Sequence, residues 1–303
     1  MTLERNHFQN GQENILAIIQ ARMSSSRLPG KVLLEISGQP MLVRVIERTR
    51  RAKMLDGVVV ATTIDSSDDA IEELCQQRGY ICYRGSMHDV LDRYYQAALS
   101  YKADVIVRVT GDCPLMDPVV MDETILTLWG HPDFESTSSS IQSKISHPQS
   151  AIHFDFAANR LPPPWYRTYP IGLDVEVCTF AALERAWKEA DQPFQREHVM
   201  PYFYEGISPA KPEHVAPLQS FISQHGFRVA FLNHEPDYGQ LRWTVDTPAD
   251  LDLLRRIYEH FPGRDNFSWL EVLSLFEHEP GLAETNANIR SKIIYEVDQR
   301  RVD

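Results

Sequence analysis

The sequence has no long hydrophobic run, and its first residues carry no apolar segment. None of its 303 residues lies in an apolar stretch near the ~20 residues that cross a bilayer. Residues 1–13 are polar, so we expect a flexible N-terminal tail and neither secretion nor membrane insertion. Basic residues are also scarce, with 30 Lys and Arg against 42 Asp and Glu, which disfavours nucleic acid as a partner. The lack of a membrane-spanning run and of an apolar N-terminal segment predicts a soluble globular protein of the cytoplasm.

Cysteine is rare as well. The four cysteines form no CxxC pair and have no zinc-ligand spacing; they are Cys75, Cys82, Cys113 and Cys178. We expect free, buried thiols in a reducing compartment.

Several well-known phosphate-binding and catalytic motifs are missing. Lys31 follows Gly30 but precedes Val32, so the GxxxxGK[ST] pattern of a P-loop is absent. The chain also lacks a GxGxxG dinucleotide fingerprint and a GxSxG nucleophile elbow. Residues 65–69 superficially resemble the DxD metal motif of glycosyltransferases, but we interpret them as a loop and a helix start.

A cationic loop follows the first hydrophobic segment. Residues 15–19 have the composition of a strand buried on both faces, and the loop after them holds Arg22, Arg27 and Lys31 among three serines and a glycine. Small residues let backbone amides approach phosphate oxygens, and the cations add charge. A polyanion site at the carboxyl end of a strand is one interpretation. An ordinary solvated loop is the other.

Strand-like and helix-like segments alternate through the first half of the chain. Expected strands are 58–63, 80–83 and 104–109, and expected helices are 40–53, 68–78 and 87–101. A further helix is expected over 269–276. This alternation predicts an α/β fold with a parallel sheet.

Two aspartates follow expected strands. Asp112 comes after the strand 104–109, and Asp246 follows an expected strand over 241–245. A carboxylate at such a position can hold a divalent cation against phosphate, although an aspartate in a Gly-Asp turn often only caps the turn. Three neighbours of Asp246 are assigned to helix initiation, as N-cap, first helical residue and capping-box acid: Thr247, Pro248 and Asp250.

Seven segments together resemble a known family. In chain order they are ARMSSSRLPGKVL, VVATT, RGS with DVLDRYYQAA, RVTGDCPLMDP, YPIGLDVEV, REHVMPY and LRWTVDTPADL. They resemble the cytidylyltransferases that activate acidic sugars, a group that includes the acylneuraminate and 3-deoxy-manno-octulosonate enzymes. The resemblance is closest to the spore coat polysaccharide biosynthesis protein F branch and covers about residues 14–262.

The resemblance implies a fold and a reaction. The fold is a Rossmann-like nucleotide-diphospho-sugar transferase fold, with a mainly parallel central sheet flanked by helices, and its members are often homodimers. The reaction transfers CMP from CTP to a sugar or sugar-like acceptor and releases pyrophosphate, with Mg²⁺, in surface or spore-coat polysaccharide biosynthesis.

The resemblance also implies roles for particular residues. Arg22 and Lys31 would hold the β- and γ-phosphates, with Arg27 a weaker candidate, and Asp112 and Asp246 would bind the metal. Asp112 also belongs to the nucleotide site, to which Arg84 and Ser86 correspond as well. The catalytic set is therefore Arg22, Lys31, Asp112 and Asp246. The expected acceptor side consists of Asp174, Glu176, Arg196, Glu197 and His198.

The residues on the acceptor side have competing interpretations. Glu197 or His198 could act as a base, but a structural ion pair between Arg196 and Glu197 is an equal alternative. Asp174 and Glu176 alternate along an expected strand over 173–177 and would share one face. They could join the metal shell or bind acceptor hydroxyls, or they could lie on an exposed strand face.

The expected organisation is a nucleotidyltransferase domain over 14–262, with an insertion at about 135–153 and a C-terminal extension over 263–303. Two other functions remain open. One is a non-catalytic nucleotide-binding scaffold of a polysaccharide pathway, and the other is a GT-A-like glycosyltransferase that uses a finished nucleotide-sugar.

Overall fold

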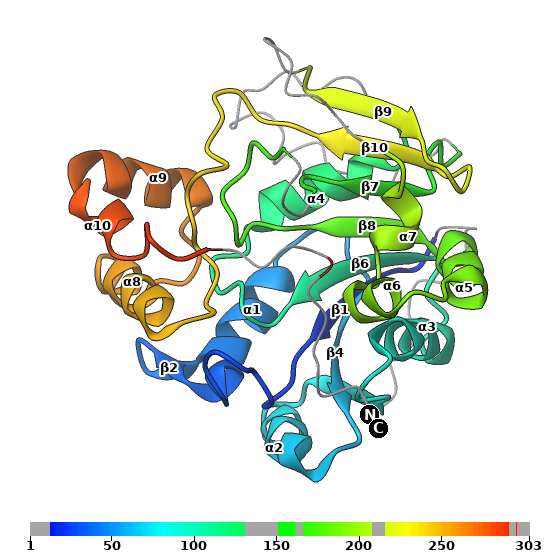
Figure 1. Cartoon of the computed structure of the whole chain (residues 1–303). Coiled ribbons are helices and arrows are strands. Elements are labelled where there is room, and N and C mark those ends of the chain that lie inside the picture. Colours follow the sequence, from blue (N-terminus) through cyan, green and yellow to red (C-terminus); the bar gives the residue numbers. More distant parts are fainter. Residues whose placement is uncertain (1–12, 131–150, 162–165, 208–215, 291–294, 296–303) are drawn as a thin grey trace.

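The structure is a computed structural model that describes residues 13–130, 151–161, 166–207, 216–290 and 295 (Figure 1). Most of the expected insertion at 135–153 lies outside the described residues. The same holds for residues 1–12 of the expected N-terminal tail and for nearly all of the chain beyond residue 290.

A mixed sheet of eight strands forms the centre of the molecule, in the order β5-β4-β1-β6-β8-β7-β10-β9. Strands β5, β4, β1 and β6 are parallel, β8 is antiparallel to both its neighbours, and the edge strand β9 is antiparallel to β10. The strands are β1 (Ile15–Gln20), β4 (Gly57–Thr63), β5 (Ile81–Gly85), β6 (Val105–Thr110), β7 (Phe156–Ala158), β8 (Glu176–Thr179), β9 (Leu218–Ile222) and β10 (Arg228–Leu232). The expected α/β architecture is confirmed.

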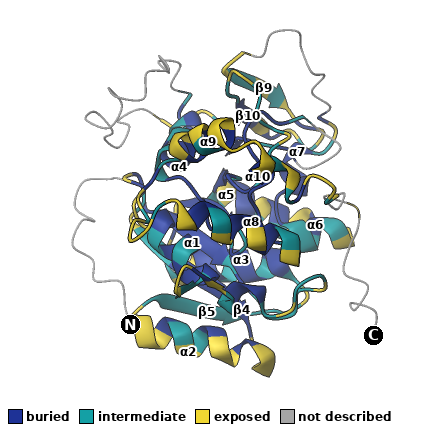
Figure 2. Cartoon of the chain, turned by 90° about the vertical axis from the view of Figure 1, so that its left-hand side faces the viewer, coloured by how far each residue is buried: buried dark blue, intermediate teal, exposed yellow. Residues whose placement is uncertain are grey.

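Helices cover both faces of the sheet, as Figure 1 shows. On one face lie α1 (Met41–Thr49), α2 (Asp69–Arg78), α4 (Pro118–Thr127), α8 (Pro248–Glu259), α9 (Trp269–His278) and α10 (Gly281–Glu284). On the other lie α3 (Val90–Ser100), α5 (Phe180–Glu189), α6 (Pro193–His198) and α7 (Pro201–Tyr204). A hydrophobic core lies on each face of the sheet, and strand β1 contributes to both. Ile15 and Ala17 pack into the core beneath the first group of helices, and Leu16 and Ile18 pack into the core beneath the second. Figure 2 shows this double-sided burial, with exposed residues on the outer sides of the helices.

Short elements complete the first half of the chain. A 3₁₀ turn, η1 (Lys31–Leu33), leads into a small hairpin of β2 (Glu35–Ile36) and β3 (Gln39–Pro40). A second 3₁₀ turn, η2 (Ser66–Asp68), precedes α2. Residues 65–69 thus form a loop and a helix start, as expected, and Asp65 caps the turn by accepting a hydrogen bond from the Ser67 amide.

Two expected strands differ in the structure. Residues 241–245 form no regular strand, because their backbone bonds alternate between separate partners: Trp243 N donates to Ile171 O, and Val245 N donates to Asp112 O. The segment has only one isolated bridge, between Arg242 and Ile171. The strand expected over 173–177 begins later, at Glu176, so Asp174 precedes β8.

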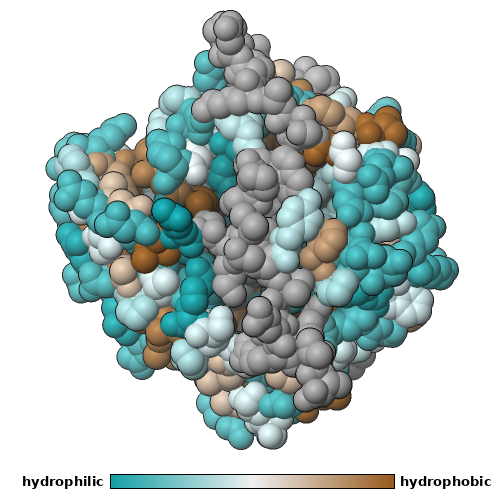
Figure 3. Space-filling view, viewed as in Figure 1, coloured by the Kyte–Doolittle hydropathy of each residue, from teal (hydrophilic) through white to brown (hydrophobic). Residues whose placement is uncertain are grey.

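The described surface has few hydrophobic residues. On the face in Figure 3 hydrophilic residues predominate, and hydrophobic ones form small separate patches. Cys75, Cys113 and Cys178 are buried and Cys82 is half-buried, and all four thiols are free, as expected. No helix within the described ranges has the length and apolarity that a membrane span requires.

Candidate active site

The cationic loop after β1 is a tightly folded support for Lys31. Gly30 adopts a left-handed conformation with φ of 70°, which glycine adopts at low cost, and its amide donates to Met23 O at 2.9 Å. The backbone of the same residue, Met23, is also held by Asp68, whose carboxylate accepts a hydrogen bond of 2.7 Å from the Met23 amide. The loop therefore places Lys31 in the interior, where it is only 8% exposed.

The ammonium group of Lys31 joins two carboxylates. Its Nζ lies 2.7 Å from Asp112 Oδ2 and 2.9 Å from Asp246 Oδ1, and it also donates to Val245 O at 2.6 Å. Burial alone would lower the pKa of Lys31, but the charges of Asp112 and Asp246 outweigh it and raise the pKa above its ordinary value. Lys31 is therefore charged at neutral pH.

Backbone contacts bring the two carboxylates together. Asp112 follows β6, and its carbonyl oxygen accepts hydrogen bonds from the Val245 amide at 2.9 Å and from Thr244 Oγ1 at 3.1 Å. Gly111 packs against the end of β1 by donating to Gln20 O at 2.9 Å. The turn after β6 and the segment before α8 thus meet beside the end of β1.

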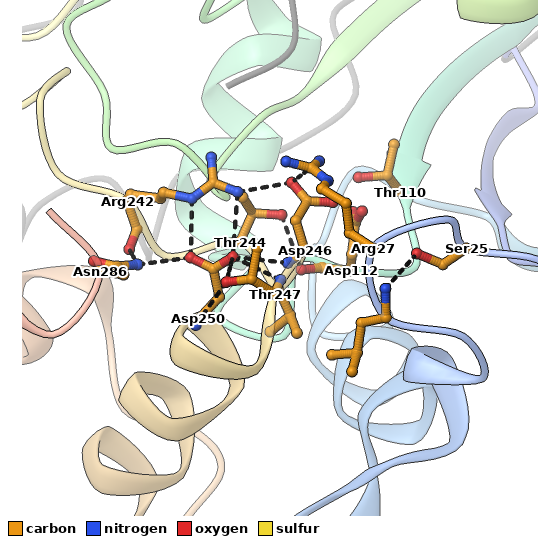
Figure 4. A network of polar contacts seen from close by, with 12 residues as sticks. Ser25, Arg27, Thr110, Asp112, Arg242, Thr244, Asp246, Thr247, Asp250 and Asn286 are labelled. Atoms are coloured by element: carbon orange, nitrogen blue, oxygen red, sulfur yellow. Dashed lines mark hydrogen bonds and ion pairs between the residues drawn. The ribbon is translucent and has the colours of Figure 1, made fainter. Parts of the chain in front are cut away.

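Asp246 lies among three cations. Oδ2 is 2.8 Å from Arg27 Nη2 and 2.7 Å from Arg242 Nη2 (Figure 4). Oδ1 is 2.9 Å from Lys31 Nζ. Burial favours the neutral acid, but the Lys31 charge, followed by Arg27 and the Arg242 hydrogen bond, lowers the pKa of Asp246 to about 2. Asp246 is therefore ionised throughout the neutral range.

A second group of contacts fixes Arg242. Its Nε donates to Asp250 Oδ1 at 2.9 Å, and Thr247 and Asp250 form the expected capping box at the start of α8. Asn286, just after α10, donates from Nδ2 to Arg242 O at 3.0 Å and to Asp250 Oδ1 at 2.9 Å. Figure 4 shows the Arg242 side chain joined to both Asp246 and Asp250, with Asn286 beside Asp250. Asn286 therefore supports Arg242 and Asp250, the residues that orient Asp246.

A cleft of about 250 Å³ opens over this cluster, at the carboxyl ends of β1 and β6. Seven of the predicted site residues line it: Arg22, Arg27, Lys31, Asp112, Glu197, His198 and Asp246. Parts of the chain far apart in sequence thus contribute cations, carboxylates and a histidine to one polar space, a composition suited to a polyanionic ligand.

Three predicted residues are engaged outside the cleft lining. Arg84 donates to Thr63 O at 2.8 Å and forms an ion pair with Glu72 on α2 at 2.7 Å. Ser86 Oγ accepts from the Asp89 amide at 3.0 Å. Arg196 pairs with Asp89, with Nε 2.9 Å from Oδ2, so its ion-pair partner is not Glu197 as one interpretation had it. The nucleotide and acceptor roles of these residues stay predictions.

Asp174 and Glu176 belong to a buried network of arginines. Asp174 Oδ1 is 2.7 Å from Arg167 Nη1, and Glu176 pairs with Arg108 and Arg160. Glu176 is 2% exposed, so the interpretation as an exposed strand face is wrong. Arg160 contacts both carboxylates, as expected for two acids on one side of the segment. Neither acid lines the cleft.

Sequence reasoning missed three contributors to the site. Asp68 anchors the loop, Asn286 supports Arg242, and Arg93 lines the cleft from α3. A signal for Arg93 was present, because it lies three positions after Val90 and four before Ala97, on the buried stripe of its helix. No comparable local pattern marked Asn286.

Comparisons with known proteins agree with this geometry. A family model described as "Cytidylyltransferase" matches residues 16–261. An uncharacterised protein of Methanocaldococcus jannaschii is 35% identical over 286 residues, covering 94% of this chain and 99% of the relative. The spore coat polysaccharide biosynthesis protein SpsF of Bacillus subtilis is 30% identical, over 89% of this chain and 97% of that protein.

Solved structures show the same fold. A cytidylyltransferase from Leptospira borgpetersenii superposes with a TM-score of 0.72 at 28% identity, covering 92% of this chain and 99% of the other. A CMP:2-keto-3-deoxy-manno-octonic acid synthetase complexed with CTP gives a TM-score of 0.53 at 19% identity, over 82% and 99% of the two chains, a likeness of fold alone. The expected resemblance is confirmed, and the chain belongs to the cytidylyltransferase family of nucleotidyltransferase enzymes.

Proposed function

We propose that this protein transfers CMP from CTP to a sugar-like acceptor and releases pyrophosphate, as a step of surface or spore-coat polysaccharide biosynthesis. The observation that carries the proposal is the contact of Lys31 Nζ with Asp112 and Asp246 at the floor of a cleft lined by Arg22 and Arg27. The name of the Bacillus subtilis relative supports the pathway.

The cations of the loop would bind the leaving pyrophosphate. Lys31 and Arg27 both contact Asp246, and phosphate oxygens offer the same charge and hydrogen-bonding capacity as its carboxylate. When the triphosphate enters, we expect the two side chains to turn from the carboxylate to the phosphates. They would then neutralise the negative charge that develops on the leaving group.

The donor set suits Mg²⁺. This ion usually takes one or two protein carboxylates and completes its shell with substrate phosphates and water. Asp112 and Asp246 already meet around one cation, the Lys31 ammonium, and within the described ranges no cluster of three His, Cys, Asp or Glu side chains offers a complete protein site. When bound, Mg²⁺ would neutralise charge on the phosphate oxygens, held by Asp112 and Asp246.

The acceptor would enter from the side of the cleft where Glu197 and His198 lie. An oxygen of the acceptor would attack the α-phosphorus in line, and pyrophosphate would leave on the side held by Lys31 and Arg27. No covalent intermediate with the enzyme is required. His198 or Glu197 would accept the proton if the attacking group is a hydroxyl.

Nucleotide binding and turnover can be tested separately. We expect CTP with Mg²⁺ to raise the unfolding temperature more than ATP, GTP or UTP does. With CTP, Mg²⁺ and a panel of 3-deoxy sugar acids and sugar phosphates, at least one acceptor should give stoichiometric pyrophosphate and a CMP conjugate. Stabilisation by another triphosphate, with none by CTP, would refute the choice of base.

No specific observation favours the other functions. Of the three acids in the DxD-like stretch, Asp65 caps a turn, Asp68 anchors the cationic loop and Asp69 pairs with Arg84. A non-catalytic scaffold would bind nucleotide without turnover over the whole acceptor panel. The cytoplasmic location and the homodimer stay predictions.

A further inference from the structure

Arg93 differs from the other buried arginines of the described chain. It is 2% exposed and lines the cleft from α3, and its Nη1 donates to Ser86 O at 2.8 Å. Its Nε is buried and has no hydrogen-bond acceptor. Most of the Arg93 guanidinium therefore has no protein partner within the described residues.

Every other buried arginine in the described ranges pairs with a carboxylate. They are Arg48 with Asp265, Arg108 with Glu176, Arg167 with Asp174, and Arg242 with Asp246 and Asp250. Asp68 and Asp89 attract Arg93 only from beyond ion-pair distance. Both are already engaged, Asp68 with the Met23 amide and Asp89 with Arg196.

The surroundings disfavour the charge that Arg93 carries. Burial, and to a smaller extent the positive charge of Arg22, lower the pKa of Arg93 to about 10, which still leaves it charged at neutral pH. A buried cation without a counter-ion is strongly destabilising. The open space beside it is the cleft, which also contains Arg22 and Lys31. An anion in that space would therefore gain from a guanidinium that pairs with no carboxylate in the described part of the chain.

We propose that Arg93 is a phosphate-binding residue of the cleft, whose counter-ion is the triphosphate of the bound nucleotide. The proximity of Arg22 favours the triphosphate over a singly charged acceptor, because two neighbouring guanidinium groups are best neutralised by a ligand with several negative charges. The inference rests on the proposed function for the identity of the ligand. It adds a contact from α3 to the contacts from the loop after β1.

The test compares binding of CTP, inorganic pyrophosphate and cytidine, by calorimetry in the presence of Mg²⁺, to wild type, Arg93→Met and Arg93→Lys. We expect Arg93→Met to weaken CTP and pyrophosphate binding about 10- to 100-fold, the range for a charged hydrogen bond, and to leave cytidine binding unchanged. Arg93→Lys should recover part of the loss. Arg185→Met is the matched control, because Arg185 is an exposed arginine on α5.

Thermal unfolding without ligand separates binding from a structural role. Arg93→Met should unfold at or above the wild-type temperature, because it removes a buried charge that pairs with no carboxylate among the described residues, and it should show a smaller upward shift with pyrophosphate. Equal affinity of wild type and Arg93→Met for CTP and pyrophosphate would overturn the inference. So would a variant that is strongly destabilised yet stabilised by pyrophosphate as much as wild type. If wild type binds pyrophosphate but not CTP, the proposed function fails and the phosphate site stands.

Discussion

Lys31 and Asp246 are 215 positions apart in the chain, yet Nζ of the lysine lies 2.9 Å from Oδ1 of the aspartate. The contact joins the loop after the first strand to the start of α8. The two charged groups therefore come together only when the loop after β1 and the segment before α8 have both folded into place.

Replacing either aspartate at the floor of the cleft should stop turnover. Asp112→Asn and Asp246→Asn each remove a negative charge that faces Lys31, and with it a proposed ligand of the metal. We expect pyrophosphate release to fall about 100-fold or more, the loss seen when a preorganised transition-state contact is removed. Asp252→Asn, at an exposed position of α8, is the matched control and should keep full activity. Wild-type rates in both cleft variants would refute the proposed metal site.

The contribution of Asp246 to stability should depend on pH. Its pKa falls from 3.8 to about 2 in the folded protein, so the stabilisation is complete above pH 3.8 and disappears as the pH falls toward 2. A shift of this size corresponds to about 2 kcal/mol. The difference in unfolding free energy between wild type and Asp246→Asn, from urea titrations, should therefore shrink between pH 6 and pH 2.5. A difference that stays constant over this range would contradict the assigned ion pairs.

Asn286→Ala should destabilise the protein by about 1–3 kcal/mol, because it removes one hydrogen bond to a charged carboxylate and one to a backbone carbonyl. We also expect slower turnover, since Arg242 and Asp250 orient Asp246. Urea unfolding and initial rates of pyrophosphate release measure the two effects. The exposed Asn288 provides the control, and Asn288→Ala should change neither quantity. Identical behaviour of the two variants would show that the contact has no supporting role.

Gly172→Ala should be strongly destabilising. Gly172 has a φ of 109°, and an added Cβ would lie 2.6 Å from the carbonyl carbon of Trp243. The strained backbone and this clash together cost at least about 2 kcal/mol. Differential scanning calorimetry would detect the loss as a lower melting temperature. Gly281→Ala, where an added Cβ meets nothing within 4 Å, should melt at or slightly above the wild-type temperature.

The sequence predicts the first half of the fold well, because its elements are local and periodic. The capping box at Thr247 and the loop around Lys31 are similarly local. The segment 241–245 is predicted as a strand but forms none, because the alternation of apolar and polar residues gives no information on which neighbours its backbone will bond. Its partners, Ile171 and Asp112, are known only from tertiary structure.

The same limit applies to the site. Residue type and position suggested Asp112 and Asp246, and the structure brings them to one cation. The sequence did not indicate that Asp174 and Glu176 form buried ion pairs, because their arginine partners lie on other segments of the chain. The role of Arg93 depends on the lack of an ion-paired carboxylate among the residues that the structure describes, and single-sequence patterns do not encode such a lack.

The position of Asn286 has a consequence for the order of events during synthesis. Every strand of the eight-stranded sheet lies before residue 233, whereas the support under Arg242 comes from a residue beyond α10. A chain emerging from the ribosome would assemble its sheet first and receive this last hydrogen-bond donor only after the remaining helices. We expect the architecture of the protein to form before its catalytic competence, and shortening from the C-terminal side to impair catalysis while the sheet persists.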